Sequence, residues 1–528
     1  MVTHHHPRVR IPPEEDVREF NLRRGIIHTE ISPRLARGLI GLFLLIICGV
    51  PLSQFFQPDR WEVWELFETI PTRASLHHYE TTLETTSAPR TFVQPYLQLA
   101  ASAWGGFGNV NAVIGRGGWL FYAPGIEYVT GRGFLDPNRL KWRWKERIDA
   151  GDAAFHPDPR PAIKEFAALC RQYGARLVLL PVPDKAMLQP AQLSGRVTLP
   201  GATPNNPDFG RFVAEMQAAG IEVFDATPTT LTAGDVRFLQ QDTHWTPDWM
   251  DAVSRALAAR LGPTAPPTAT LEPVAVTRVG DLVDMLKLPA HQQLFLPQTI
   301  TVQRVLDSGT RQSWQPSHDA DILVLGDSFT NVFSAEVMGW GDSAGFVEHL
   351  SYHLGKPVDR ITRNDNGASA TRQILAEEMA RGNDRLKGKR VVVWEFAIRE
   401  LMVGDWKPIT YRLDQPAPRQ FFVPSAGQTV QVSGRIVAIA PAPRPGTVPY
   451  KDHIIALHLT DLPGGRDALV YVWSMRNNVW TPAARWQPGQ QVTLKLRAWS
   501  DVEAKYEAIN RAELSDENLL SAEPCWSE

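Results

Sequence analysis

Two short segments carry residue types that could perform nucleophilic acyl chemistry. The first is GDSF, in which Ser328 follows the apolar run ILVL and precedes a helical stretch. A serine at the carboxyl end of a buried strand has its hydroxyl at the sheet edge where ligands bind, beside the free N–H groups of a helix start. The tripeptide alone is a weak signal, and its place between a strand and a helix is what favours a nucleophile.

The second segment, DTHW, could supply the base that a serine hydroxyl needs. In an extended stretch Asp242 and His244 point to the same face, while Thr243 points away. Thr246 and Pro247 are typical of a helix N-cap and first helical residue, which places the pair at the mouth of a helix. The histidine is then either the base of a triad or a packed side chain that only the aspartate satisfies. No partner set with zinc spacing accompanies it, so we predict no metal.

These residues need a rigid frame, and residues 101–412 predict one built from helices and parallel strands. A helical stretch at 161–174 ends in glycine and leads into the apolar run ARLVLLPV, and similar units recur along the segment. Helices that alternate with fully apolar strands are typical of an α/β layer around a buried parallel sheet. We therefore predict a doubly wound α/β domain.

After residue 412 the pattern changes to short alternating runs such as QVSGRIVAIA and DALVYVWSM, separated by Gly and Pro turns. We predict a small all-β domain over 413–528, which is either an OB-like barrel or a β-sandwich. This domain could bind a glycan or dock a partner, and both roles stay open.

The amino-terminal region predicts attachment to a membrane. Residues 38–56 carry no charge, a stretch near the minimum length for crossing a bilayer core. Arginines precede it and acidic residues follow it, so the positive-inside bias places the rest of the chain outside the cytoplasm. We predict a cytoplasmic leader at 1–35, one transmembrane anchor at 36–56 and a stalk at 57–100. A cleaved signal peptide or a buried core helix is the alternative interpretation.

The composition of the whole chain excludes other classes of function. The 528 residues carry a formal net charge of -3 without a block of lysine and arginine, so we exclude nucleic-acid binding. Three cysteines are too few for a disulfide scaffold, and Cys170 and Cys525 either pair in an oxidising compartment or stay two buried thiols. We predict no cofactor.

Seven motifs, spread over about residues 100–412, together resemble a known family. They are GRGGWLF, LLPVPDKAMLQP, DTHWTP, GDLVDMLKLP, GDSF, NDNGAS and VVVWEFAIREL. In this combination they look like the alginate O-acetyltransferase family of the AlgJ/AlgX type, a branch of the SGNH hydrolase-like superfamily in which the histidine precedes the serine. The resemblance implies an SGNH-like fold, an acyl-serine mechanism and a polysaccharide acceptor. It also implies an acetyl donor delivered by a multi-spanning O-acyltransferase in the membrane.

The resemblance further implies roles for individual residues. Ser328 would be the nucleophile, His244 the base, and Asp242 the group that orients the base. The backbone N–H groups of Ser328 and Gly367 would form an oxyanion hole, although Gly367 is equally consistent with a simple turn. Asn366 is a further candidate donor.

Other side chains are candidates for contact with a substrate. Trp245, beside the histidine, is placed to meet a sugar ring. Lys185 could contact an anionic acceptor or be a solvated loop lysine. Glu395 stands where the superfamily has its oxyanion asparagine, with Arg399 about one helical turn later, and this pair could be structural.

The sequence thus predicts an O-acetyltransferase that acetylates hydroxyls of an exopolysaccharide, alginate-like or other. Its single-pass anchor would lie in the inner membrane and its catalytic domain in the periplasm. The competing interpretations are a carbohydrate esterase on the same triad and a non-catalytic glycan-binding scaffold of an export complex.

Overall fold

The structure of the protein is a computed structural model. It describes residues 32–54, 76, 80, 89–149, 154–196, 203–231, 236–364, 366–413, 421–445, 448, 450–507, 509–514, 516, 519 and 522–528. The chain forms two compact units, Met1–Gln94 and Pro95–Glu528. Most of the predicted leader and stalk therefore lies outside the described residues.

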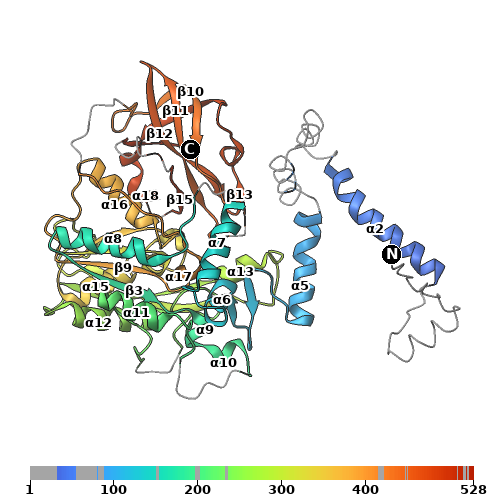
Figure 1. Ribbon diagram of the computed structural model, residues 1–528, viewed down its shortest axis with the longest axis horizontal. Coiled ribbons are helices and arrows are strands. Elements are labelled where there is room, and N and C mark those ends of the chain that lie inside the picture. Colours follow the sequence, from blue (N-terminus) through green and yellow to red (C-terminus); the bar gives the residue numbers. More distant parts are fainter. Residues whose placement is uncertain are drawn as a thin grey trace, which may run out of the picture. The chain divides into compact units, whose positions relative to one another are not determined.

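A five-stranded parallel sheet forms the centre of the second unit (Figure 1). Its order is β4 (Glu222–Val223), β3 (Arg176–Val182), β9 (Val391–Ala397), β7 (Ile322–Gly326) and β8 (Asp359–Thr362). Every neighbouring pair is parallel. Carboxyl ends of parallel strands meet at one edge of a sheet, and GDSF begins at that edge, where β7 ends. The predicted α/β domain with a parallel sheet is confirmed.

Helices cover both faces of this sheet, with α8 on one side and α12 and α15 on the other (Figure 1). The connecting helices are α8 (Pro159–Gln172), α11 (Phe209–Ala218), α12 (Pro247–Leu261), α15 (Phe346–Leu354) and α16 (Ala370–Ala380). Helix α8 illustrates why they pack here. Ile163, Phe166, Ala167 and Cys170 recur at helical spacing and are all buried. All residues of β7 and β9 are buried as well, as expected for strands covered on both faces.

Shorter elements surround this core. The other helices of the second unit are α5 (Gln94–Gly105), α6 (Ala123–Thr130), α7 (Pro137–Asp149), α9 (Lys185–Leu188), α10 (Pro190–Leu193), α13 (Asp281–Leu286), α14 (Ser328–Asn331), α17 (Glu400–Val403) and α18 (Glu503–Tyr506). Two antiparallel pairs join β1 (Ala112–Ile114) to β2 (Leu120–Tyr122) and β5 (Ala269–Arg278) to β6 (Gln298–Asp307). Helix α13 follows β5 and brings the GDLVD motif toward the site described below.

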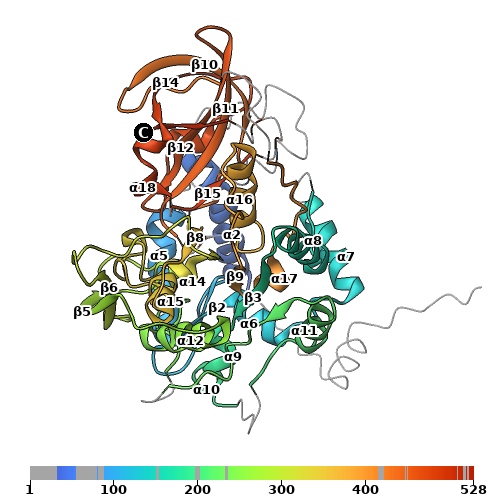
Figure 2. The same cartoon turned by 90° about the vertical axis from the view of Figure 1, so that its left-hand side faces the viewer.

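The carboxyl-terminal strands close into a small barrel beside the α/β domain (Figure 2). Their order is β13 (Val479–Trp480), β12 (Arg466–Arg476), β16 (Pro524–Ser527), β14 (Gln491–Ala498), β10 (Val430–Ile439), β11 (His453–Leu462) and β15 (Arg511–Ala512). Strand β12 also pairs with β11, and this pairing closes the ring. The predicted small all-β domain is therefore a barrel and not a sandwich. Cys525 lies buried in its core and Cys170 in the core of the α/β domain, both as free thiols.

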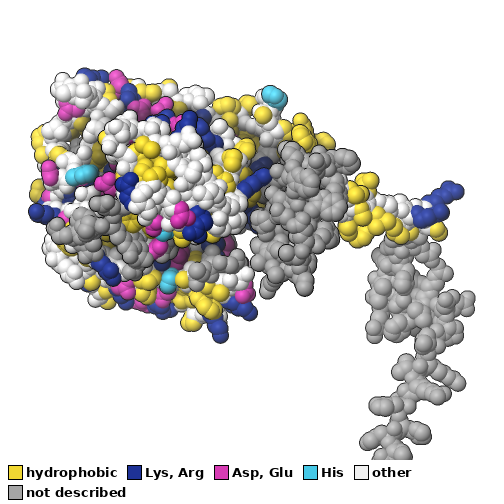
Figure 3. Space-filling view, turned by 90° about the horizontal axis from the view of Figure 1, so that it is seen from above, with side chains coloured by type: hydrophobic (Ala, Val, Ile, Leu, Met, Phe, Trp, Pro, Cys, Tyr) yellow, Lys and Arg dark blue, Asp and Glu magenta, His cyan; other side chains and the backbone are white. Residues whose placement is uncertain are grey.

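The first unit contains helix α2 (Pro33–Gln54), which covers most of the predicted anchor. Hydrophobic side chains dominate its surface, and arginines stand near its beginning (Figure 3). Nevertheless, in the part of the chain that the structure describes, no helix has both the length and the apolar character needed to span a membrane. The prediction of a transmembrane anchor at 36–56 is thus not confirmed, and residues 55 and 56 lie outside the described part.

Candidate active site

The turn between β7 and α14 presents Ser328 at the edge of the sheet. Asp327 caps the helix, since its Oδ1 accepts from the Phe329 N–H at 2.9 Å. The other oxygen of Asp327 accepts from the Ala397 N–H at 2.7 Å, which ties the turn to the end of β9. The serine side chain is therefore held by a rigid turn at the start of a helix.

The structure brings Ser328, His244 and Asp242 together, as the sequence predicts. His244 Nε2 lies 2.9 Å from Ser328 Oγ, and His244 Nδ1 lies 2.6 Å from Asp242 Oδ1. Because Nδ1 faces a carboxylate, it carries the ring proton, and Nε2 is free to accept the serine proton. The N-cap role of Thr246 is also confirmed, since its hydroxyl accepts from the Trp249 N–H at 3.3 Å.

Two groups that the sequence analysis did not select hold Asp242 in place. Its Oδ2 accepts from the indole N–H of Trp340 at 2.8 Å and from the Asp281 backbone N–H at 3.0 Å. Burial alone would raise the pKa of Asp242, but the hydrogen bond and charge of His244, with these two donors, lower the pKa below its ordinary value. Asp242 is therefore an anion that can stabilise a protonated His244.

Asp281 is a second buried carboxyl group in the same cluster. Its oxygens face the Thr243 N–H at 2.8 Å and the Thr243 hydroxyl at 2.5 Å, and one of them lies 3.9 Å from His244 Nδ1. Burial first, and then repulsion from Asp242, raise the pKa of Asp281 to about 7. Near neutral pH this group can exist in either protonation state.

The two predicted oxyanion residues lie in different settings. Gly367 packs against the nucleophile turn, because a Cβ on it would stand 3.0 Å from Asp327 Oδ2 and 3.1 Å from the Phe396 Cβ. A Cβ there would push these neighbours away by a few tenths of an ångström, so glycine suits the close approach of the two segments. Asn366 has a positive φ of 48° and its side chain is exposed, so it belongs to a turn at this edge.

The predicted aromatic contact with a sugar is wrong. Trp245 is fully buried and packs its ring against Phe329, Trp249 and Phe346. The physical reason is the alternation of an extended chain, in which the residue after His244 points to the opposite side, here into the core.

The interpretation of Lys185 as a solvated loop lysine is wrong, because the residue is buried. It is also not one of the residues that line the cavity described below. Its ammonium group is buried and donates to the carbonyl oxygens of Leu120 at 2.8 Å and Gln240 at 3.4 Å. Burial lowers the pKa of Lys185 to about 7.

Glu395 and Arg399 each form a hydrogen bond with a different residue. Arg399 donates to Asp184 at 2.9 Å, in a pair that is almost fully buried. Glu395 accepts from the Asp327 N–H at 2.9 Å, and burial together with the charge of Asp327 raises its pKa well above the ordinary value. A neutral Glu395 thus supports the nucleophile turn from behind. Neither residue lines the cavity.

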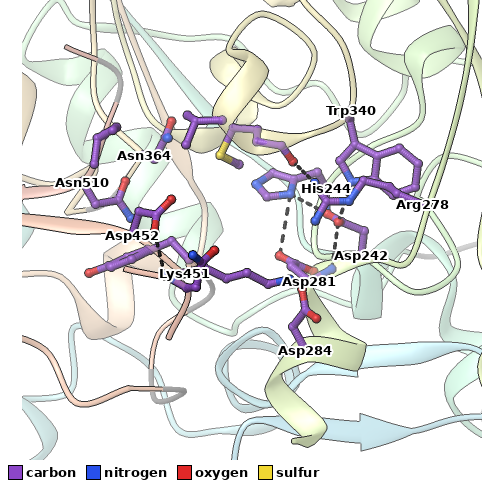
Figure 4. A pocket seen from close by; sticks show the side chains of 15 residues that line it. Asp242, His244, Arg278, Asp281, Asp284, Trp340, Asn364, Lys451, Asp452 and Asn510 are labelled. Carbon is purple, nitrogen blue, oxygen red and sulfur yellow. Dashed lines mark hydrogen bonds and ion pairs between the residues drawn. The ribbon is translucent and has the colours of Figure 1, made fainter. Parts of the chain in front are cut away.

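A cavity of about 260 Å³ opens beside His244, between the α/β domain and the barrel (Figure 4). Asp242, Trp340 and His244 lie on one side of the view, while Lys451, Asp452 and Asn510 of the barrel lie on the other. The rest of the lining consists of Arg278, Asp281, Asp284, Val337, Met338, Asn364, Tyr450, Asn477 and Ile509. Residues from the barrel could not be assigned to the site from sequence, because no local pattern reports which surfaces of two domains meet.

Among the described residues, two groups have the ligand types and spacing to hold a metal ion. One is Asp242, His244 and Asp281, and the other is Asp251, His349 and His353. In the first group, His244 hydrogen-bonds to Asp242 and Ser328, and Asp281 accepts from the N–H and hydroxyl of Thr243. In the second, Asp251 Oδ1 accepts from His349 at 2.7 Å and from His353 at 2.6 Å, which ties α12 to α15.

A parallel α/β sheet with a serine at a strand end, backed by histidine and aspartate, is the arrangement that α/β proteins use to activate a serine nucleophile. Comparison with known families specifies the class further. Residues 112–398, more than half of the chain, match the family described as SGNH hydrolase-like domain, acetyltransferase AlgX. The protein belongs to this family, as its motifs predict.

Individual relatives are more distant. The "Probable alginate O-acetylase AlgJ" of Pseudomonas aeruginosa is 29% identical over 209 residues, which is 37% of this chain and 46% of that protein. The chain thus matches less than half the length of this relative. Among solved structures, the O-acetyltransferase domain of Pseudomonas putida AlgJ has a TM-score of 0.40 at 21% identity, covering 56% of this chain and 93% of that one. Pseudomonas aeruginosa AlgX has a TM-score of 0.36 at 14% identity, covering 75% and 92%.

Proposed function

We propose that the protein transfers acetyl groups to hydroxyls of an extracytoplasmic polysaccharide through an acyl-enzyme on Ser328. The observation that carries the proposal is the hydrogen-bond chain from Ser328 Oγ through His244 to Asp242, with distances of 2.9 and 2.6 Å. Membership in a family of acetyltransferases supports the choice of acetyl as the transferred group.

In the first half-reaction, His244 Nε2 accepts the proton of Ser328 as Oγ attacks the acetyl carbonyl of the donor. The tetrahedral intermediate then collapses, and the donor's leaving group departs with the proton from His244. The backbone N–H of Ser328, the first residue of α14, is suited to stabilise the oxyanion, because the first N–H groups of a helix have no carbonyl partner within it. The product is an acetyl ester on Ser328.

In the second half-reaction, a sugar hydroxyl takes the place of the donor. His244 accepts its proton as the sugar oxygen attacks the acetyl ester, and Ser328 Oγ leaves with that proton. The cavity beside His244 is where we place the acceptor, since it opens next to the base and is lined by polar side chains. Asp242 stabilises the imidazolium formed in both steps.

The test uses the purified protein with an activated acetyl ester, with and without oligosaccharides, and reads both protein and sugar by mass spectrometry. We expect an acetylated Ser328 and acetylated sugar, and neither in Ser328→Ala. Ser254→Ala is the matched control, because Ser254 is a buried serine of α12 whose hydroxyl donates only to its own helix, to the Asp251 carbonyl at 2.8 Å. Release of acetate without acetylated sugar would identify an esterase, and the absence of any acyl-enzyme would exclude catalysis.

We further propose that the protein works at the inner membrane, with its catalytic domain in the periplasm, and receives acetyl groups from a membrane-bound multi-spanning O-acyltransferase. The support is the charge-free stretch at 38–56, with Arg34 and Arg37 before it and acidic residues after it. Fractionation of cells that produce the full chain, with and without residues 36–56, tests this. Recovery of the full chain in the soluble fraction would contradict it.

A further inference from the structure

The cavity beside His244 is lined by more acidic than basic groups. Among its described lining residues, four carboxyl groups (Asp242, Asp281, Asp284 and Asp452) face two cationic side chains, Arg278 and Lys451. Even with Asp281 protonated, the acidic groups outnumber the basic ones. An anionic ligand would therefore enter a cavity that already carries negative charge.

Both cationic side chains of the cavity already have partners within the protein. The ammonium group of Lys451 pairs with Asp284 at 2.8 Å, across the boundary between barrel and α/β domain. The guanidinium of Arg278 donates to the carbonyl oxygens of Val279 and Met338, and it lies over the Trp340 ring with 5.5 Å between Cζ and the ring centroid. Both side chains thus have structural partners, and recognition of a carboxylate would have to break these contacts.

One polar side chain of the cavity has no partner of its own. Asn510, from the barrel, is 1% exposed, and neither its Oδ1 nor its Nδ2 has a hydrogen-bond partner. The segment itself is well anchored, since the Asn510 carbonyl accepts from the Ile454 N–H at 2.9 Å. A buried amide with both atoms unsatisfied is costly, so this side chain favours a bound group that both donates and accepts hydrogen bonds.

We propose that this cavity binds a neutral, hydroxyl-rich sugar as the acceptor, and that Asn510 of the barrel is one of its binding residues. A hydroxyl group is both donor and acceptor, so it can satisfy either atom of the Asn510 amide, and it can donate to Asp452. A uronate ring keeps the secondary hydroxyls, but it carries a carboxylate in place of the C6 hydroxymethyl group and so brings negative charge into an acidic cavity. The proposal rests on the proposed function and names the chemical class of its acceptor.

The test compares two acceptors that differ only at C6. Oligosaccharides of β-1,4-linked mannose and of β-1,4-linked mannuronate, of equal length, are offered to the full chain that has been acetylated with an activated ester. We expect the neutral oligosaccharide to be acetylated with a kcat/KM at least ten-fold higher. Equal use of the two acceptors, or preference for the mannuronate, would overturn the proposal.

Substitutions of cavity residues test which side chains bind the neutral acceptor and which disfavour the mannuronate. Asn510→Leu should raise KM for the neutral acceptor about ten-fold, while Gln431→Leu, which removes an exposed amide on β10 of the same barrel, should not. Asp452→Asn should narrow the gap between the two acceptors, because it removes one negative charge from the cavity and keeps an oxygen that can accept from the Asn477 N–H. An unchanged KM in Asn510→Leu would mean that water alone satisfies the amide, and would refute its role in binding.

Formation of the acetyl-enzyme is recorded in every sample before the acceptor is added. If wild-type protein forms no acyl-Ser328, the proposed function itself has failed. If it forms acyl-Ser328 but shows no preference between the acceptors, only the inference about the acceptor has failed. Should Asn510→Leu lose its fold, Asn510→Asp replaces it, and its added charge should lower use of the mannuronate further.

Discussion

Replacing Asp281 with asparagine should change how the stability of the protein depends on pH. Burial and the neighbouring Asp242 raise the pKa of Asp281 from 3.8 to about 7 in the folded chain. Asparagine resembles the protonated carboxyl group in shape. Its oxygen can accept from the Thr243 N–H as Asp281 Oδ1 does, and its amide can donate to the Thr243 hydroxyl.

The sign follows from proton binding. Between about pH 4 and pH 7 the folded state keeps the Asp281 proton, whereas the unfolded chain has lost it. The free energy of unfolding contributed by this group therefore falls as pH rises through that window, and it stays constant above the folded pKa. A pKa displaced by about three units corresponds to on the order of 4 kcal/mol, at about 1.4 kcal/mol per unit. Asparagine does not titrate, so Asp281→Asn should not lose stability in this way as the pH rises.

The assay is unfolding in urea at pH 4.5, 6 and 8, followed by tryptophan fluorescence. We expect Asp281→Asn to gain stability relative to wild type from pH 4.5 to pH 8, by a few kcal/mol. Asp284→Asn is the control on the same helix, since its partner is Lys451 on the barrel. Parallel pH profiles for wild type and Asp281→Asn would refute the reasoning, because they would show that Asp281 titrates alike in the folded and unfolded states.

Other substitutions test how Asp242 contributes to catalysis, and how Trp340 and Trp245 contribute to stability. Asp242→Asn should lower kcat for acetyl transfer about 10⁴-fold, as in other Ser-His-Asp sites, because His244 is left in the wrong tautomer. Trp340→Phe removes a donor to the buried Asp242 carboxylate, so urea unfolding should show a loss of about 1.5–3 kcal/mol. Trp245→Ala should cost about 3–5 kcal/mol in the same assay, because the ring packs in the core. The folded variant should keep the wild-type acceptor KM, because Trp245 does not line the cavity.

The sequence predicted those parts of the site that depend on local geometry. Asp242 and His244 share a face because they are two residues apart in an extended segment, and Ser328 lies at a sheet edge because it follows a buried strand. The same alternation should have sent Trp245 to the opposite side, and the error came from treating closeness in sequence as closeness to the acceptor. Local rules were sufficient for the fold class as well, since continuous apolar strands between helices predict a parallel sheet.

Features that depend on long-range packing could not be predicted in this way. Trp340 reaches Asp242 from 98 positions along the chain, and Asp327 meets the backbone of Ala397 from 70 positions away. Lys185 illustrates the same limit. From sequence, a lysine in a proline-rich loop is expected to be solvated, but here its ammonium group is buried and donates to the carbonyl of Leu120 on β2. The choice between barrel and sandwich likewise depended on the pairing of β11 with β12, which short alternating runs do not specify.

The proposed acceptor cavity is formed by residues from two parts of this chain. The match to the acetyltransferase family covers residues 112–398 and includes Ser328, His244 and Asp242. Asn510 and Asp452, which form the opposite wall of the cavity, lie beyond the end of that match. Under our proposals, a protein could keep the α/β domain and its acyl-serine reaction, while a different carboxyl-terminal domain would change part of the acceptor cavity. The excess of carboxyl groups in the cavity, three from the α/β domain and Asp452 from the barrel, is the physical reason for proposing a neutral sugar as the acceptor.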